Sequence, residues 1–185
     1  MKLPNSFQCV ASVISILSMT AVSVAHAEPL KVGSSAPLFS LKDQDGKDVQ
    51  LSERKNKGWS VLYFYPKAGT PGCTTQACAF RDSVSVIRKE GAEVFGISSD
   101  EVTKLAAFHK EHKLTFSLLS DPNSKTISEY GVKMPIVGMA KRWTFIVDPE
   151  LKIRYINDKV DPALDAKLVS DTLKMLKASS AVPAK

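Results

Sequence analysis

The strongest constraint on this chain is a cysteine that follows a buried-strand pattern and a helix-start signal. Residues 61–65, Val-Leu-Tyr-Phe-Tyr, form a short apolar run typical of a buried β-strand. Thr70 and Pro71 then supply a hydroxyl at the N-cap and a proline at the first helical position. Apolar residues recur at helical spacing as far as residue 87. The sequence therefore predicts a helix over residues 71–89, with Cys73 in its first turn.

A cysteine at this position is a candidate reactive thiolate. The unpaired backbone N–H groups of a first turn, and the helix dipole, both favour an anion there. A free thiol is only about 3% ionised at pH 7, and making it mostly thiolate requires about 3.4 kcal/mol. A helix terminus typically supplies ~0.3–1 kcal/mol, whereas a guanidinium about 4 Å away supplies about 4 kcal/mol at moderate dielectric. We therefore expect an arginine from elsewhere in the chain to lie beside Cys73.

Cys78 is the second cysteine of the same predicted helix, five residues after Cys73. On an intact helix, residues at this spacing have Cα atoms about 8–9 Å apart. A disulfide requires less than ~7 Å between Cα atoms, so a Cys73–Cys78 bond needs the first turns to unwind. This requirement favours a transient redox pair over a static structural disulfide.

The N-terminal stretch is predicted to be a targeting segment. After Lys2, an apolar run from Cys9 to Val24 is interrupted only by serine and threonine, and Ala25-His26-Ala27 follows. This pattern is typical of a secretory signal peptide comprising residues 1–27. A retained membrane anchor is the alternative, but the run is short and diluted by serines. We expect export to the periplasm, loss of Cys9 with the signal, and no stable membrane association afterwards.

The remaining chain, residues 28–185, has a length that suits one domain. The whole sequence carries a net charge of +6 at pH 7, without a block of lysine or arginine. So thin a positive excess favours ordinary solubility over nucleic-acid binding.

The rest of the chain alternates strands and helices. The predicted elements are a hairpin around Asp45-Gly46, strands 60–65, 93–98 and 116–119, helices 71–89, 101–112 and 123–130, a hairpin of strands 143–147 and 151–156, and a helix over 162–177. Asp100 or Ser99 is expected to cap the second helix. In the last helix, the face carrying Leu164, Leu168, Leu173 and Leu176 is expected to be buried, and residues 178–185 to be a flexible tail. This order predicts an α/β domain with a central mixed sheet between helices, in a thioredoxin-like arrangement with an N-terminal β-hairpin extension.

The active-site segment resembles that of the peroxiredoxins, in particular the peroxiredoxin Q branch, also called bacterioferritin comigratory protein. The matching stretches are Phe64-Tyr65-Pro66-Lys67, Thr70-Pro71-Gly72-Cys73-Thr74, Ala77-Cys78-Ala79-Phe80-Arg81-Asp82, Leu118-Leu119-Ser120-Asp121, Tyr130-Gly131-Val132 and Arg142-Trp143-Thr144-Phe145-Ile146-Val147-Asp148. The second cysteine, five residues after the first, is what narrows the resemblance to this branch.

The resemblance implies a thiol peroxidase that reduces hydrogen peroxide and organic hydroperoxides. Cys73 is then the peroxidatic cysteine and Cys78 the resolving one, with reduction by a thioredoxin-like or other envelope thiol donor. Thr70 is expected to hydrogen-bond the peroxide, Pro66 to shield the pocket from water, and Arg142 to be the arginine required beside Cys73. No cofactor and no metal are implied, and the chain is expected to be a monomer.

Other interpretations remain open at this stage. A copper-binding thioredoxin-fold protein, or a protein thiol–disulfide exchange protein, would also use closely spaced cysteines. Thr70 could be only a helix cap, and Arg142 only a solvated charge at a strand edge. The chain also departs from the family pattern at Ala68-Gly69 and at Gln76, where relatives often carry acidic residues, which bears on the choice of reductant and peroxide.

Overall fold

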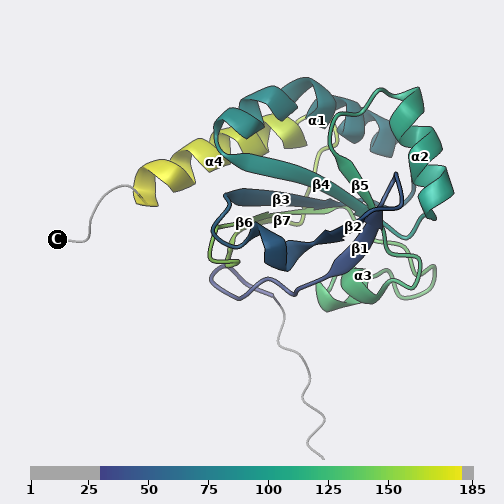
Figure 1. The fold of residues 1–185 in the computed structure, drawn as a ribbon, viewed down its shortest axis with the longest axis horizontal. Helices are drawn as coiled ribbons and strands as arrows, with labels where there is room; N and C mark the ends of the chain where they lie inside the picture. Colours follow the sequence, from purple (N-terminus) through teal and green to yellow (C-terminus); the bar gives the residue numbers. More distant parts are fainter. Residues whose placement is uncertain (1–29, 181–185) are drawn as a thin grey trace, which may run out of the picture.

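The computed structural model describes residues 30–180, which form a seven-stranded mixed sheet with helices on both faces (Figure 1). The strand order is β2-β1-β5-β4-β3-β6-β7. The strands are β1 (Ser40–Asp43), β2 (Asp48–Gln50), β3 (Trp59–Phe64), β4 (Ala92–Ser98), β5 (Ser117–Ser120), β6 (Trp143–Val147) and β7 (Ile153–Asn157). The helices are η1 (Leu51–Arg54), α1 (Pro71–Lys89), α2 (Val102–Glu111), α3 (Lys125–Glu129) and α4 (Asp165–Ser180). The predicted α/β class and the N-terminal hairpin are confirmed.

Strand β3 organises the core because it is buried along its whole length. It pairs in parallel with β4 and antiparallel with β6. Successive side chains of a strand point to opposite faces, so Val61 and Tyr63 enter one apolar cluster whereas Leu62 and Phe64 enter the other. A strand packed on both faces needs a continuous apolar run, which is why this stretch carries no polar alternation.

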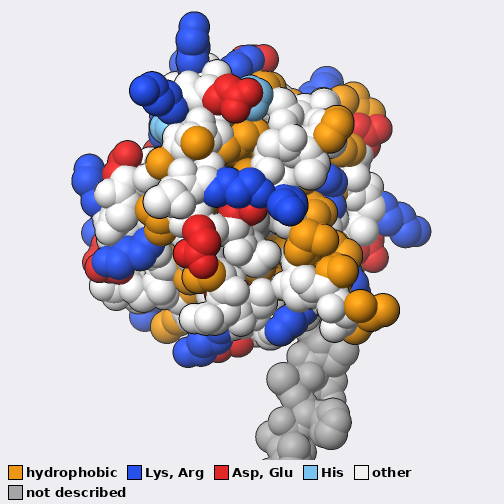
Figure 2. Space-filling view, turned by 90° about the vertical axis from the view of Figure 1, so that its right-hand side faces the viewer, with side chains coloured by type: hydrophobic (Ala, Val, Ile, Leu, Met, Phe, Trp, Pro, Cys, Tyr) orange, Lys and Arg blue, Asp and Glu red, His pale blue; other side chains and the backbone are white. Residues whose placement is uncertain are grey.

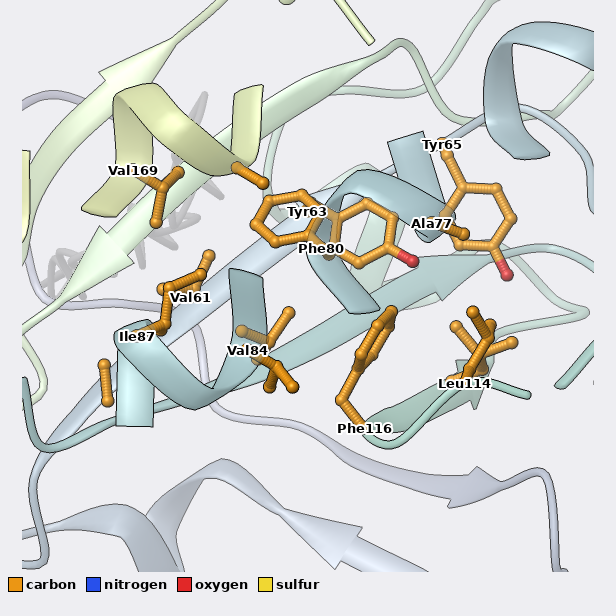
Figure 3. Close-up of a cluster of buried hydrophobic side chains, with 14 of the residues drawn as sticks. Val61, Tyr63, Tyr65, Ala77, Phe80, Val84, Ile87, Leu114, Phe116 and Val169 are labelled. Carbon is orange, nitrogen blue, oxygen red and sulfur yellow. The ribbon is translucent and has the colours of Figure 1, made fainter. Parts of the chain in front are cut away.

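Helices α1, α2 and α4 supply the cluster on one face of the sheet, and α3 with η1 supplies the other (Figure 1). On the α1 face, the ring of Tyr63 stacks on that of Phe80 with centroids 4.7 Å apart, and Phe116 packs edge-on against both (Figure 3). Val84 and Ile87 continue the buried stripe of α1, as its helical spacing predicts.

Helix α4 differs from its prediction in both bounds and face. It begins at Asp165 rather than residue 162 and continues to Ser180, past the expected start of the tail at residue 178. Its buried positions include Ala166, Val169 and Leu173, whereas Leu164 and Leu168 are 59% and 42% exposed. The face of α4 that is buried is the one that packs against α1, and the positions of the leucines alone do not identify it.

The start of α2 also differs from its prediction. The N-cap is Glu101, without a side-chain hydrogen bond, rather than Asp100 or Ser99. The Asp100 carboxylate instead accepts the Ala68 N–H at 2.7 Å and pairs with Lys104 at 2.6 Å. It therefore anchors the loop between β3 and α1.

The surface mixes acidic and basic side chains without a large patch of one sign on the face that Figure 2 shows, which agrees with the thinly spread charge of the sequence. Within residues 30–180, we find no helix with the length and apolar character needed to cross a bilayer. The predicted signal peptide, residues 1–27, lies outside the described residues.

Candidate active site

Cys73 lies in the first turn of α1, as predicted. The helix has Thr70 at its N-cap and Pro71 at its first position, and the Thr70 carbonyl accepts the Thr74 N–H at 2.9 Å. The hydroxyl of Thr70 does not cap the helix; it donates to the Lys67 carbonyl at 3.0 Å. The lone pairs of the Thr70 hydroxyl oxygen are therefore not used in a capping hydrogen bond. Cys73 itself is only 1% exposed, so a reactant must reach it through local opening.

Arg142 is the arginine that the electrostatic argument requires. It directly precedes β6, whose first residue, Trp143, pairs with Phe64 at the end of β3. The start of β6 therefore lies beside the loop that leads to α1. The Arg142 guanidinium donates from Nη2 to the Cys73 sulfur at 3.3 Å. The alternative, a solvated charge at a strand edge, does not describe this half-buried contact.

Gly72 leaves the space that Arg142 occupies. A Cβ atom built at Gly72 would lie 3.3 Å from Nη2 of Arg142, which is tighter than most real Cβ contacts. The backbone of Gly72 is ordinary helix, so close approach and not backbone conformation requires the glycine.

A buried hydrogen-bond network continues from Arg142 to α4. Nη1 of Arg142 donates to Oε1 of Gln76 at 2.7 Å, and Nε2 of Gln76 donates to Oδ2 of Asp165 at 2.8 Å. The same Asp165 oxygen accepts the Thr144 hydroxyl at 2.7 Å. Burial raises the pKa of the Asp165 carboxyl, and the hydrogen bonds from Thr144 and Gln76 oppose that rise. Three segments distant in sequence thus meet around Cys73.

Cys78 lies one turn further along α1, half-buried, and both cysteines are free thiols. Arg81 lies three residues later and donates to the Asp82 carboxylate at 2.8 Å and the His112 carbonyl at 2.9 Å. The hydrogen bond to Asp82 raises the pKa of Arg81 most, and Cys78 adds to that rise. With α1 intact over both cysteines, a bond between them still requires its first turns to open.

Pro66 is half-buried in the loop after β3, two residues beyond the strand end. It therefore lies at the same end of the sheet as Arg142. Sequence reasoning missed Asp165 and Thr144, and it treated Gln76 only as a departure from a family pattern. An aspartate on the buried face of an otherwise amphipathic helix was the available signal.

The fold and the cysteine–arginine contact define a thioredoxin-fold protein with a candidate reactive thiol. The family model described as "AhpC/TSA family" matches residues 32–156. Chloroplastic peroxiredoxin Q of Triticum aestivum is 47% identical over 146 residues, covering 78% of this chain and 65% of the relative. The Arabidopsis thaliana protein of the same name is 42% identical over 171 residues, covering 91% and 77%.

Solved structures agree with this likeness. The peroxidoxin BcpB of Mycobacterium tuberculosis superposes with a TM-score of 0.75 at 34% identity, covering 80% of this chain and 98% of that one. The bacterioferritin comigratory protein of Xanthomonas campestris gives 0.71 at 28% identity, covering 80% and 97%. The chain therefore belongs to the AhpC/TSA family and, within it, to the peroxiredoxin Q branch. It spans about 65% of the length of the first curated relatives that it matches.

The prediction of an exported, periplasmic protein is wrong by this comparison. The curated relatives at 42–47% identity are named as chloroplastic, which points to a plastid rather than to export. The N-terminal stretch contains several serines and no acidic residue. Transit peptides are likewise rich in serine and poor in acidic residues, although they are also rich in arginine, which residues 1–27 lack. The reason for expecting an envelope thiol donor disappears with this prediction.

Proposed function

We propose that this chain is a thiol peroxidase in which Cys73 reduces hydrogen peroxide and organic hydroperoxides. The observation that carries the proposal is the contact of 3.3 Å between Nη2 of Arg142 and the Cys73 sulfur, in the first turn of α1. The guanidinium and the helix start both favour the thiolate, which is the nucleophilic form of cysteine. Family membership supports the same chemistry.

In the first step, the Cys73 thiolate attacks one peroxide oxygen. The O–O bond breaks, a sulfenic acid forms on Cys73, and the other oxygen leaves as water or an alcohol after taking up a proton. Thr70 is proposed to hydrogen-bond the peroxide because its hydroxyl is not used as a helix cap. Pro66, at the end of β3, is proposed to limit access of water.

In the second step, the Cys78 thiolate attacks the sulfenic sulfur of Cys73. A disulfide forms and the oxygen leaves as water after protonation. An external dithiol then reduces the disulfide by exchange. This dithiol is proposed to be a thioredoxin-like donor, because membership of the peroxiredoxin Q branch implies a thiol reductant.

Activity toward organic hydroperoxides is part of the proposal. The bacterioferritin comigratory protein of Xanthomonas campestris, one of the structural relatives, is known for alkyl peroxide reduction activity. We also propose that residues 28–185 form one domain that acts as a monomer, which light scattering on the purified chain would test.

The deciding experiment compares the wild-type chain with Cys73→Ser and Cys78→Ser. One equivalent of hydrogen peroxide should lower the intact mass of the wild type by two hydrogens as the disulfide forms. Cys73→Ser should consume no peroxide, whereas Cys78→Ser should complete one turnover and retain one added oxygen. Turnover of Cys78→Ser with a thioredoxin donor at the wild-type rate would contradict the role of Cys78. Peroxide consumption by Cys73→Ser would contradict the proposed function as a whole.

A further inference from the structure

Asp165 has no contact with Cys73, yet it terminates the hydrogen-bond chain that begins there. We propose that Asp165 is a positioning residue, which keeps Arg142 beside the Cys73 sulfur by fixing the side-chain amide of Gln76. This inference rests on the proposed peroxidase function and adds a residue to the site. The carboxylate lies on α4, 89 positions from Gln76 in the sequence.

The groups on either side of Gln76 in the hydrogen-bond network, Arg142 and Asp165, allow only one orientation of its side-chain amide. Arg142 has only N–H donors, so the Gln76 atom that faces it at 2.7 Å must be the oxygen. Oδ2 of Asp165 serves as an acceptor for Gln76 at 2.8 Å and for the Thr144 hydroxyl at 2.7 Å, so the Gln76 atom facing it must be the nitrogen. Asp165 thus determines that Gln76 presents an acceptor to Arg142.

Because the Gln76 amide is buried, this orientation is costly to change. Gln76 is 0% exposed and Asp165 1% exposed, so water does not replace a lost partner at low cost. Without an acceptor on α4, the Gln76 N–H groups would remain buried and unpaired, and nothing on α4 would fix the orientation of the amide. An amide that shifts or turns no longer presents its oxygen to Arg142, so the guanidinium loses the partner that keeps it beside Cys73.

The neutral amide also separates two charges. None of the ion pairs among the described residues includes Arg142. The carboxylate therefore orders Arg142 through Gln76 without pairing with it directly. The guanidinium keeps one N–H for the sulfur of Cys73, and its charge is not cancelled by a carboxylate in direct contact.

The position of Asp165 is itself fixed by the fold. It is the first residue of α4, and its backbone N–H donates to the Asp161 carbonyl at 3.0 Å. The next residue, Ala166, is 1% exposed and belongs to the apolar cluster that α1 and α4 share. The packing of α4 on α1 thereby sets the geometry at Cys73.

The test is a double-mutant cycle on the full chain in a Cys78→Ser background. The readouts are the rate of Cys73 alkylation by iodoacetamide as a function of pH and the rate of one peroxide turnover. Asp165→Ala should lower alkylation at neutral pH by about 2- to 10-fold, the fold-change of one net hydrogen bond. Asp165→Asn keeps an acceptor and should remain near wild type. Asp171→Ala, which removes an exposed carboxylate of the same helix that pairs with Lys167 at 2.6 Å, is the matched control and should leave alkylation unchanged.

If Asp165 acts through Arg142, then Asp165→Ala should add nothing to Arg142→Met. Equal loss from Asp165→Ala with and without Arg142 would overturn the positioning role, as would unchanged alkylation in Asp165→Ala. Should Asp165→Ala fail to fold, Gln76→Met takes its place, because it removes both the oxygen that faces Arg142 and the nitrogen that faces Asp165. It should lower alkylation by the same factor, and unchanged alkylation in Gln76→Met would overturn the proposal. Alkylation does not require peroxide, so failure of the peroxidase proposal would appear separately, as absent turnover in the Cys78→Ser parent.

Discussion

Replacing Arg142 with methionine removes the guanidinium and keeps most of the apolar stem. At the observed 3.3 Å from Nη2 to the Cys73 sulfur, a charge pair is worth about 1.3 kcal/mol in bulk water and about 5 kcal/mol at an effective dielectric of 20. Arg142 is half-buried, so solvent screens part of this interaction. We take about 2 kcal/mol as the loss, which corresponds to an approximately 30-fold slower reaction of the Cys73 sulfur at neutral pH.

The assay is Cys73 alkylation by iodoacetamide across pH in a Cys78→Ser background, with thiolate ultraviolet absorbance as a second readout. Arg142→Met should react about 30-fold more slowly than its parent at neutral pH and reach the same limit at high pH. Arg142→Lys, which retains charge without the fork that bonds Gln76, should lie between the two. Arg88→Met removes an exposed arginine paired with Glu93 and should behave as wild type. Superimposable pH profiles for Arg142→Met and its parent would refute the reasoning.

Three further predictions concern packing and buried charge. Gly72→Ala should stabilise the chain toward urea by about 0.5–1 kcal/mol because alanine favours helix, yet it should slow Cys73 alkylation because its Cβ would crowd Arg142 at 3.3 Å; a faster reaction would contradict the crowding. Gly96→Ala would place a Cβ 2.5 Å from the ring of buried Tyr63, and overpacking of this kind costs about 1–3 kcal/mol in urea unfolding; an unchanged midpoint would contradict it. Burial raises the pKa of Asp165 above its ordinary 3.8, so the folded chain holds a proton that the unfolded chain releases. Stability from this group is therefore complete below about pH 3.8 and is lost as pH rises through the raised pKa. Asp165→Asn should flatten that part of the pH dependence of unfolding, and an identical pH dependence in the variant would count against it.

The sequence predicts an element well when the residues of that element alone specify where it begins and which face is buried. Helix α1 has the predicted bounds because a proline start and an apolar stripe specify it. The predicted buried face of α4 is only partly right: Leu173 is buried, but Leu164 and Leu168 are exposed, and Ala166 and Val169 are buried instead. Small residues on α4 fit against α1, and a complementary surface of this kind is a property of the helix pair.

The candidate site likewise has some features that the local sequence predicts and others that depend on tertiary packing. The position of Cys73 follows from local helix-start chemistry, and the demand for an arginine follows from the free energy needed to ionise its thiol. Which arginine meets that demand depends on the pairing of β6 with β3, which no local pattern near Arg142 specifies. Asp165 was missed because its role exists only after α4 has packed and brought it to Gln76.

The first turn of α1 holds the candidate reactive group without a side-chain cap. Proline supplies no N–H at its first position, Thr70 makes no side-chain cap, and its first turn has no acidic residue. The contact between Arg142 and the Cys73 sulfur adds a tie between that turn and the segment just before β6. In the proposed cycle, addition of oxygen to this sulfur changes the group that Arg142 contacts. We expect the substrate itself to weaken this tie and so to favour the opening of α1 that a bond to Cys78 requires.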